Sequence, residues 1–391
     1  MKNINAIDNK YNCSGCSACV HSCPKKCITM ITDDEGFKYP LVNEDDCIGC
    51  GICLKKCPWQ KGDISKTVNK RLEKPFVFAI KNNSQVRLHS TSGGAFTAIS
   101  DYVLSNNGFV CGATFNSENA EVEHELVNTI EGRNRMRGSK YVQSNMTDSF
   151  VKIKELLEND SYVLFSGTPC QTAGLASFLG KDYPKLIVID ILCHSTPSPR
   201  IFKDIINRED DTVKDIIFRD KSCGWRNSYK FTLIKGNSNI TNSTYLNMFF
   251  KGLINRPSCY NCKFTNTIRP SDITIGDYWN IKNVDSSFED SLGVSCVLIN
   301  TEKGLEVFNQ IKSGLSCIQT ELKPAIQVCM SRPVTEPKLR NKYWCDYYKY
   351  GISYVENKYG HYNWIDNLKS NILAPIVRKL GLSNIIRKIL S

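Results

Sequence analysis

CSGCSACVHSCP at residues 13–24 and CIGCGICLKKCP at residues 47–58 decide the fold of the N-terminal region. In each string, three cysteines are separated by two residues, and a fourth cysteine stands directly before a proline. This spacing lets three thiolates surround one face of a 4Fe-4S cubane, while the fourth cysteine reaches toward a second cubane. The repeat therefore predicts a small α+β, ferredoxin-like domain with two clusters over residues 1–62.

We expect the two strings to exchange their fourth cysteines. The first cluster is then held by Cys13, Cys16, Cys19 and Cys57. The second cluster is held by Cys47, Cys50, Cys53 and Cys23. Zinc is the alternative, because tetrahedral sulfur sites use similar spacings, but zinc needs no third close cysteine. Cys27 lies outside both patterns and is expected to be a packed thiol.

Cysteine usage also predicts the compartment. The 391 residues include 19 cysteines, and nine of them fall within the first 57 residues. A secreted disulfide scaffold would be shorter and would usually contain an even number. The N-terminal MKNINAIDNKYNC lacks the apolar core of a signal peptide, and no apolar run approaches 18 residues. We therefore expect a reducing, cytoplasmic location in which the thiols are free to bind metal.

The charge of the chain bears on its partners. Fifty Lys and Arg residues against 39 Asp and Glu give a net charge of +11, and the basic residues are scattered along the chain. This scatter argues against nucleic acid as a partner. An acidic redox protein, a small-molecule substrate or an anionic cofactor fits it better.

The pattern changes after a polar linker at residues 63–74. Buried strands are predicted at residues 76–80, 108–114, 162–166 and 186–192. Helical spacing appears between them at residues 93–104, 150–157 and 171–179. Further strands are predicted at 215–218, 230–235, 272–276 and 294–300, with a helix at 303–311. Alternating strands and helices predict an α/β domain with a mixed sheet over residues 75–330.

Residues 331–391 are predicted to form a helical tail. From residue 363 onward, apolar residues recur at helical spacing, and Pro375 and Gly381 should divide this segment into short helices. Its basic residues are Lys369, Arg378, Lys379, Arg387 and Lys388. We expect such a segment to dock on the protein core, with contact to an anionic membrane surface as the alternative.

Two strings suggest anion binding. Residues 89–95 read HSTSGGA before a helix, where small residues let a phosphate approach backbone N–H groups. The same residues also suit an ordinary helix cap. Residues 132–141 read GRNRMRGSKY and bring together Arg133, Arg135, Arg137 and Lys140. These cations either clamp a pyrophosphate or belong to a solvated loop.

A third metal site is also suggested. Cys170 follows the strand at 162–166, and Cys193 follows the strand at 186–192, so both should face the crevice at the carboxyl ends of the sheet. Cys259 and Cys262 add a Cys-x2-Cys pair. Together they predict a third 4Fe-4S site, and four packed thiols are the alternative. His194 is expected to be structural or to support a neighbouring group, with proton donation as the alternative.

Six strings, in order, resemble the beta-subunit family of deazaflavin-coenzyme (factor 420) hydrogenases and dehydrogenases. The strings are STSGGAF, MRGSKYVQS, FSGTPCQTAGL, ILCHSTPSP, RPSCYNCKF and GDYW. The resemblance implies an α/β fold that binds FAD, commonly beside a further iron-sulfur cluster. It implies flavin contacts from Ser92, Gly93, Gly94, Lys140 and Thr168, and it favours Cys170, Cys193, Cys259 and Cys262 as cluster ligands.

The expected function is therefore that of an iron-sulfur flavoprotein oxidoreductase. Cubanes carry single electrons, and a flavin collects two and delivers a hydride to a soluble carrier or an organic substrate. No side chain need act as a nucleophile, so no catalytic residue is assigned. Two alternatives are kept. One is a non-catalytic electron-transfer subunit of a larger complex, and the other is a partner-docking or membrane-surface protein.

Overall fold

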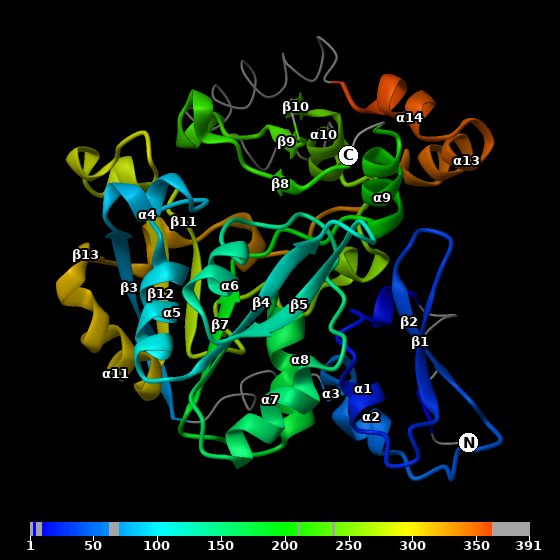
Figure 1. Cartoon of the computed structure of the whole chain (residues 1–391), viewed down its shortest axis with the longest axis horizontal. Coiled ribbons are helices and arrows are strands. Elements are labelled where there is room, and N and C mark those ends of the chain that lie inside the picture. The colour runs from blue at the N-terminus through cyan, green and yellow to red at the C-terminus, as the bar shows by residue number, and fades with distance from the viewer. Residues whose placement is uncertain (1–2, 5–9, 62–69, 210–211, 237–238, 362–391) are drawn as a thin grey trace.

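An eight-stranded mixed sheet forms the centre of the chain (Figure 1). The structure is a computed structural model, and it describes residues 3–4, 10–61, 70–209, 212–236 and 239–361. The strands follow the order β13-β3-β12-β11-β7-β6-β4-β5. Their bounds are β3 Arg71–Lys81, β4 Phe109–Asn116, β5 Glu121–Val127, β6 Val163–Gly167, β7 Leu186–Ile191, β11 Ile273–Asp277, β12 Ser295–Thr301 and β13 Ser316–Thr320. Strands β11, β7, β6 and β4 are parallel, and antiparallel strands flank them on both sides.

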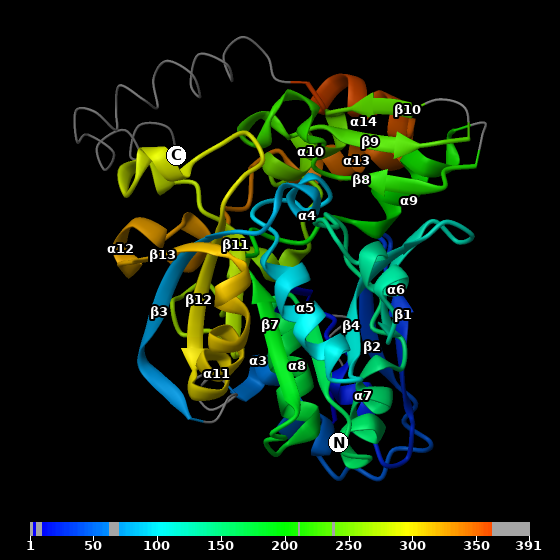
Figure 2. The same cartoon turned by 60° about the vertical axis from the view of Figure 1, so that its left-hand side comes forward.

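Helices cover both faces of this sheet, as Figure 2 shows from the side. Their bounds are α5 Ala95–Ser105 and α11 Glu302–Ile311 on one face, and α7 Ser149–Glu158 and α8 Pro169–Leu179 on the other. Successive side chains of a strand point to opposite faces. Leu164 of β6 accordingly packs with Ile99 of α5, whereas Val163 and Phe165 pack with Phe150 of α7. The three-layer α/β arrangement with a mixed sheet is therefore confirmed.

Most of the predicted elements lie within two residues of the observed ones, and β3 is the main difference. It begins at Arg71, so the last four residues of the predicted linker 63–74 belong to the sheet. Its length follows from its position, because β12 and β13 pair with it on both sides. Residues 62–69 lie outside the described ranges.

A small lobe lies over the edge of the sheet where the parallel strands end (Figure 1). Its three-stranded sheet has the order β10-β9-β8. Its elements are β8 Asp215–Ile217, β9 Phe231–Ile234, β10 Asn239–Asn242, α9 Pro199–Asn207, α10 Thr244–Phe250, α13 Arg340–Tyr350 and α14 Ile352–Tyr359. Phe202, Phe231, Tyr245 and Tyr343 are fully buried in its core. Helices α13 and α14 fall within the predicted helical tail, and the basic segment from residue 363 lies outside the described residues.

The cysteine-rich region forms a small domain beside helix α8 (Figure 1). It contains α1 Ala18–His21, a hairpin of β1 Ile28–Thr32 and β2 Lys38–Val42, α2 Ile52–Lys56 and α3 Pro58–Lys61. Helix α8 approaches this domain closely at Gly174, where an added Cβ would lie 2.9 Å from Cys16 Cβ. A second contact joins Glu35 in the hairpin turn to Arg340 of α13 through a buried ion pair.

The remaining elements are short. The helices are α4 Ser84–Leu88, α6 Ile130–Arg135 and α12 Leu322–Ala325. The 3-10 helices are η1 Lys10–Asn12, η3 Lys221–Cys223, η4 Trp225–Asn227, η5 Pro257–Asn261, η6 Ile281–Asn283, η7 Ser286–Phe288, η8 Lys312–Gly314 and η9 Val328–Met330. Across the described ranges, no helix combines the length and the apolar character needed to cross a bilayer.

Candidate functional site

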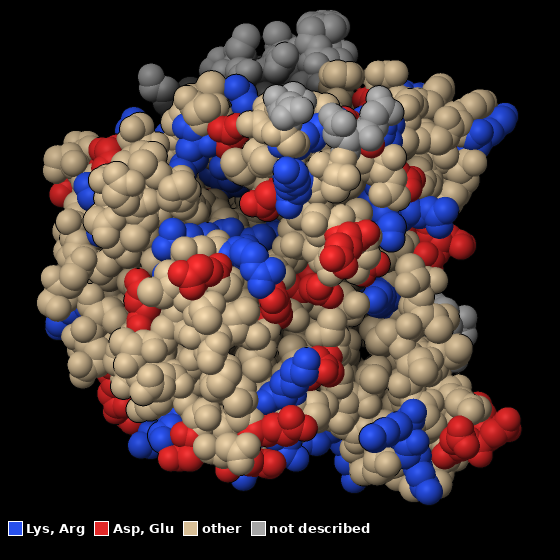
Figure 3. Space-filling view, in the orientation of Figure 1, with Lys and Arg blue, Asp and Glu red and all other residues tan. Residues whose placement is uncertain are grey.

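A cleft of about 250 Å³ opens where the parallel strands end. Strands β6, β7 and β11 run in the same direction, so Gly167, Ile191 and Asp277 meet at one edge of the sheet. The surface is hollowed between the small lobe and the sheet, and Lys and Arg side chains gather at this hollow (Figure 3). The cationic residues that line the cleft are Arg137, Lys140 and Arg219. An anionic ligand is therefore favoured here.

The sequence-predicted residues converge on this cleft. Its lining includes Ser92, Gly94, Lys140, Thr168, Cys170, Cys193 and His194. Thr168 caps helix α8 at its N-terminus, with the N–H of Thr168 donating to Gln171 Oε1 at 2.9 Å. Cys170 follows in the first turn, with its Sγ 3.1 Å from Thr168 Oγ1. The turn from β6 into α8 thus places a hydroxyl and a thiol at the same wall.

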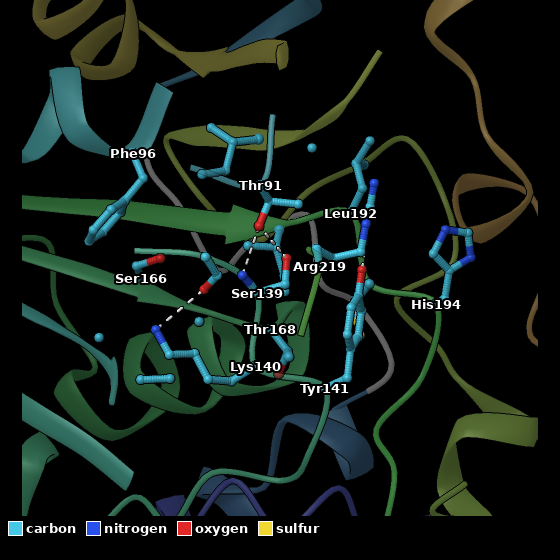
Figure 4. A pocket seen from close by; sticks show the side chains of 18 of the residues that line it. Thr91, Phe96, Ser139, Lys140, Tyr141, Ser166, Thr168, Leu192, His194 and Arg219 are labelled. Atoms are coloured by element: carbon cyan, nitrogen blue, oxygen red, sulfur yellow. Dashed lines mark hydrogen bonds between the residues drawn. The ribbon is translucent and has the colours of Figure 1, made fainter. Parts of the chain in front are cut away.

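Two loops far apart in the sequence are joined at the cleft (Figure 4). The backbone N–H of Ser139 donates to Thr91 Oγ1 at 2.8 Å, and the two hydroxyls lie 3.1 Å apart. Next to this contact, Lys140 Nζ donates to the carbonyl oxygens of Arg135 and Arg137 at 2.8 and 2.7 Å. Burial lowers the pKa of Lys140 to about 7. Near neutral pH, small changes in the surroundings of Lys140 therefore change the fraction of it that carries a positive charge.

Cys170, Cys193, Cys259 and Cys262 lie near one another. Cys259 belongs to η5 and Cys262 follows its last residue. Burial, with a contribution from the neighbouring Cys170 thiolate, raises the pKa of Cys259 to about 11. Burial, with contributions from Cys259 and Cys170, raises that of Cys262 to about 12. Burial followed by the influence of Cys259 also raises the pKa of Cys193. These four half-buried thiols are thus close enough to influence one another's pKa.

The N-terminal cysteines lie in two neighbourhoods. Burial and then Cys57 and Cys13 raise the pKa of Cys16, and burial and then Cys16, Cys13 and Cys57 raise that of Cys19. A separate small cavity is lined by Cys23, Cys47, Cys50 and Cys53. Cys27 lines the same cavity, with its Sγ 3.5 Å from Cys23 Sγ, and it is buried as expected of a packed thiol.

These thiol groups fit iron-sulfur clusters. A cysteine must lose its proton to ligate a metal, and burial opposes this in both Cys16 and Cys170. Thiolates at these positions are therefore stable only beside a bound cationic metal group. In the part of the chain that the structure describes, no three ligating side chains are close enough to bind a single metal ion.

Two family models match the chain. Residues 12–61 match the 4Fe-4S dicluster domain, and residues 160–323 match the C terminus of the coenzyme F420 hydrogenase/dehydrogenase beta subunit. The chain joins a 4Fe-4S dicluster domain to an F420 hydrogenase/dehydrogenase beta-subunit domain. The family resemblance drawn from the six strings is thereby confirmed. This places the chain among iron-sulfur redox proteins.

One chain of the F420-reducing [NiFe] hydrogenase complex from Methanosarcina barkeri matches with 18% identity and a TM-score of 0.46. The match covers 75% of the present chain and 92% of the hydrogenase chain. No curated protein sequence matches the chain. The strings STSGGAF and MRGSKYVQS precede residue 160 and lie outside the matched part of the beta-subunit domain.

Within the beta-subunit domain and the region before it, two of the suggested anion contacts serve the fold. An added Cβ at Gly93 would lie 2.2 Å from Ile80 O and 2.4 Å from Ser295 N, so Gly93 allows close packing against β3 and β12. Gly94 lines the cleft with a φ of +83°. Arg133 is buried, and its Nη1 contacts Ser100 Oγ and Asp101 Oδ1, both at 2.7 Å. Its cation therefore stabilises the packing of α6 on α5.

An aromatic wall of the beta-subunit domain was missed by sequence reasoning. Arg219 Nη1 donates to Asp277 Oδ2 at 3.1 Å, and its guanidinium lies 4.9 Å from the Tyr229 ring and 5.3 Å from the Trp279 ring. Trp225 stacks on Trp279 with ring centroids 4.8 Å apart. GDYW contains Asp277 and Trp279, but no pattern in the sequence links them to Arg219 or Tyr229. Only the packing of the small lobe over the sheet brings these residues together.

Two histidines complete the lining. His124 of β5 is buried, stacks on Phe165 and bonds through Nε2 to Ser166 O at 3.0 Å, while its Nδ1 has no hydrogen-bond partner. Burial lowers its pKa to about 4, so the ring is neutral and presents one free nitrogen. Burial also lowers the pKa of His194, whose ring is drawn in Figure 4. Sequence reasoning missed His124, because β5 was not predicted.

Proposed function

We propose that the chain is an iron-sulfur flavoprotein oxidoreductase. In this proposal, electrons pass through 4Fe-4S clusters to or from FAD and a hydride carrier or organic substrate. A bound flavin would supply the exchange between single electrons and electron pairs. The observation that carries the proposal is that Cys170 and Cys193 line the same cleft as Ser92, Gly94, Lys140 and Thr168.

The proposed relay has three groups of ligands. Cys23, Cys47, Cys50 and Cys53 would hold the outer cluster, and Cys50 is exposed at the surface. Cys13, Cys16, Cys19 and Cys57 would hold the next one. Cys170, Cys193, Cys259 and Cys262 would hold the innermost cluster, beside the cleft. An electron entering at the exposed end would therefore travel inward in three steps.

Contacts between the dicluster domain and helix α8 support this order. Cys16 Sγ lies 3.0 Å from the position that a Cβ of Gly174 would occupy. Ser14, between Cys13 and Cys16, lines the cleft, and its side chain is close enough to lower the pKa of Cys170 against the larger effect of burial. One loop of the dicluster domain thus contacts both the helix and the thiol of the inner group, so no wide gap separates the two cluster sites.

The cleft itself would orient the flavin. Lys140 and Arg137 would neutralise the pyrophosphate, and the turn at Gly94 lets a ligand approach the backbone. The neutral His124 would accept a hydrogen bond at Nδ1. His194 would serve mainly in packing at the end of β7. Its second role there would be to hold or donate a proton.

Anaerobic purification tests the proposal. We expect about twelve irons per chain, corresponding to three cubanes of four irons, together with about one flavin per chain in the visible spectrum. A measured content of about eight irons and one flavin per chain would show that the innermost cluster is absent. Absence of flavin after reconstitution with FAD would instead favour a non-catalytic electron-transfer subunit of a larger complex. Zinc in place of iron would contradict the redox function altogether.

A further inference from the structure

A buried guanidinium lies between the dicluster domain and the beta-subunit domain. Arg256 is only 1% exposed. Its Nε donates to Cys13 O at 2.8 Å, and its Nη2 donates to Lys38 O at 3.0 Å. Its Nη1 donates to Gln143 Oε1 at 2.7 Å. All three acceptors are uncharged oxygens, so the hydrogen bonds leave the positive charge unneutralised.

Two aromatic rings surround the same guanidinium. Its Cζ lies 4.2 Å from the centroid of Tyr39 and 5.3 Å from that of Phe37. Burial by itself lowers the pKa of Arg256, but Tyr39, Cys13 and Cys259 raise it overall. Arg256 is therefore a permanent cation in an environment that contains little water.

Other buried arginines of the chain have acidic partners. Arg269 lies 2.7 Å from Asp190, and Arg340 pairs with Glu35. Among the described residues, Arg256 forms no ion pair with an aspartate or glutamate. Asp33 is within electrostatic range, but its Oδ2 already lies 2.5 Å from Lys10 Nζ. A buried cation without a counter-charge is costly, so an anionic group is expected beside it.

The surroundings indicate which anions these are. Cys13 belongs to the proposed middle cluster, and Cys259 belongs to the proposed innermost cluster. The charge of Arg256 also lowers the pKa values of Cys170 and Cys259, against the larger opposing effect of burial. A cubane with four thiolate ligands carries net negative charge, which grows by one unit on reduction. Arg256 bonds to the backbone of Cys13 and is within electrostatic range of Cys259, so it is near one ligand of each site.

We propose that Arg256 is the fixed counter-charge of the middle and innermost clusters, and that it raises their reduction potentials above that of the outer cluster. The inference rests on the proposed function for the innermost cluster alone. The step concerned is the transfer of one electron, in which one cluster is oxidised and the next reduced, with no bond broken and no proton moved. A nearby cation stabilises the more negative, reduced state. Electrons therefore collect at the inner end of the relay, next to the cleft.

Redox titration of the full chain, followed by EPR, tests Arg256 as the counter-charge of these clusters. Arg256→Gln removes the charge and keeps an amide donor. Gln143→Glu leaves Arg256 in place and neutralises it with a carboxylate. Arg256→Lys keeps the charge and loses the fork geometry. Lys323→Gln, an exposed cation on α12 beside β3, removes one charge at a distance from the dicluster domain.

We expect Arg256→Gln and Gln143→Glu each to make reduction of two of the three clusters about tenfold less favourable, which is about 59 mV for a one-electron couple. Arg256→Lys and Lys323→Gln should remain close to wild type. If Arg256→Gln does not retain iron, Gln143→Glu decides the question. Potentials unchanged in Gln143→Glu would overturn the inference. If the wild type contains eight irons, the innermost cluster is absent. Arg256→Gln and Gln143→Glu are then expected to shift a single potential, that of the middle cluster.

Discussion

Cys170→Ser is expected to lower the iron content from about twelve to about eight atoms per chain, while the dicluster domain keeps both of its clusters. A serine hydroxyl is a much poorer ligand for iron than a thiolate, and Cys170 is one of four thiols that would share the innermost site. Loss of this cluster interrupts the path to the cleft. The flavin should therefore no longer be reduced when a one-electron donor reduces the protein.

Cys329→Ser is the matched control for this experiment. Cys329 is also buried, and its thiolate contributes to the raised pKa of Cys193. It lies outside the proposed ligand set, so its replacement should leave about twelve irons in place. Retention of all twelve irons in Cys170→Ser, or loss of four in Cys329→Ser, would show that the ligands were assigned incorrectly.

Lys140→Met is expected to weaken FAD binding by roughly 10- to 150-fold, because a hydrogen bond to a charged group contributes about 1.5–3 kcal/mol. The ammonium supplies positive charge at the cleft and holds the carbonyl oxygens of Arg135 and Arg137 in one turn. Equilibrium binding of FAD to the flavin-free protein measures the loss. Lys140→Arg, which keeps the charge, should bind FAD more tightly than Lys140→Met.

The pH dependence gives an independent check on Lys140. Its pKa near 7 means that the flavin-free protein loses this positive charge as the pH rises above 7. FAD affinity should therefore fall between pH 7 and pH 9 in the wild type, and Lys140→Met should show a flatter profile. Arg135→Met is the control, since the Arg135 side chain is exposed and paired with Glu125 at 2.5 Å. Equal pH profiles for Lys140→Met and the wild type would contradict the role assigned to Lys140.

The sequence predicted those features that depend on local spacing. The grouping of Cys16 with Cys13, Cys19 and Cys57 follows from the repeated pattern, because a cubane needs three nearby thiolates and one from the opposite string. The positions of Cys170 and Cys193 follow from a second rule, since parallel strands end at the same edge of a sheet. Both rules need only the order of residues along the chain.

Features that depend on packing between distant segments could not be predicted in this way. Arg219 and Trp279 meet only because the small lobe closes over the sheet. Gly93 was expected to contact a ligand, and the structure adds that the paired backbones of β3 and β12 leave no room for a Cβ at this position. Arg256 stood unremarked before a Cys-x2-Cys pair, and its importance comes from partners more than one hundred residues away.

The interdomain contacts determine how the dicluster domain and the rest of the chain cooperate. Arg256 bonds to backbone oxygens of the cysteine-rich domain, Glu35 pairs with Arg340, and Gly174 receives Cys16. All three contacts are buried and have no long flexible side chain at the surface. The dicluster domain is thus held in place and does not swing on its connection to the rest of the chain. The rate of turnover in such an arrangement is set by electron tunnelling over fixed distances and by the exchange of outside partners. No movement of the domain has to precede electron transfer.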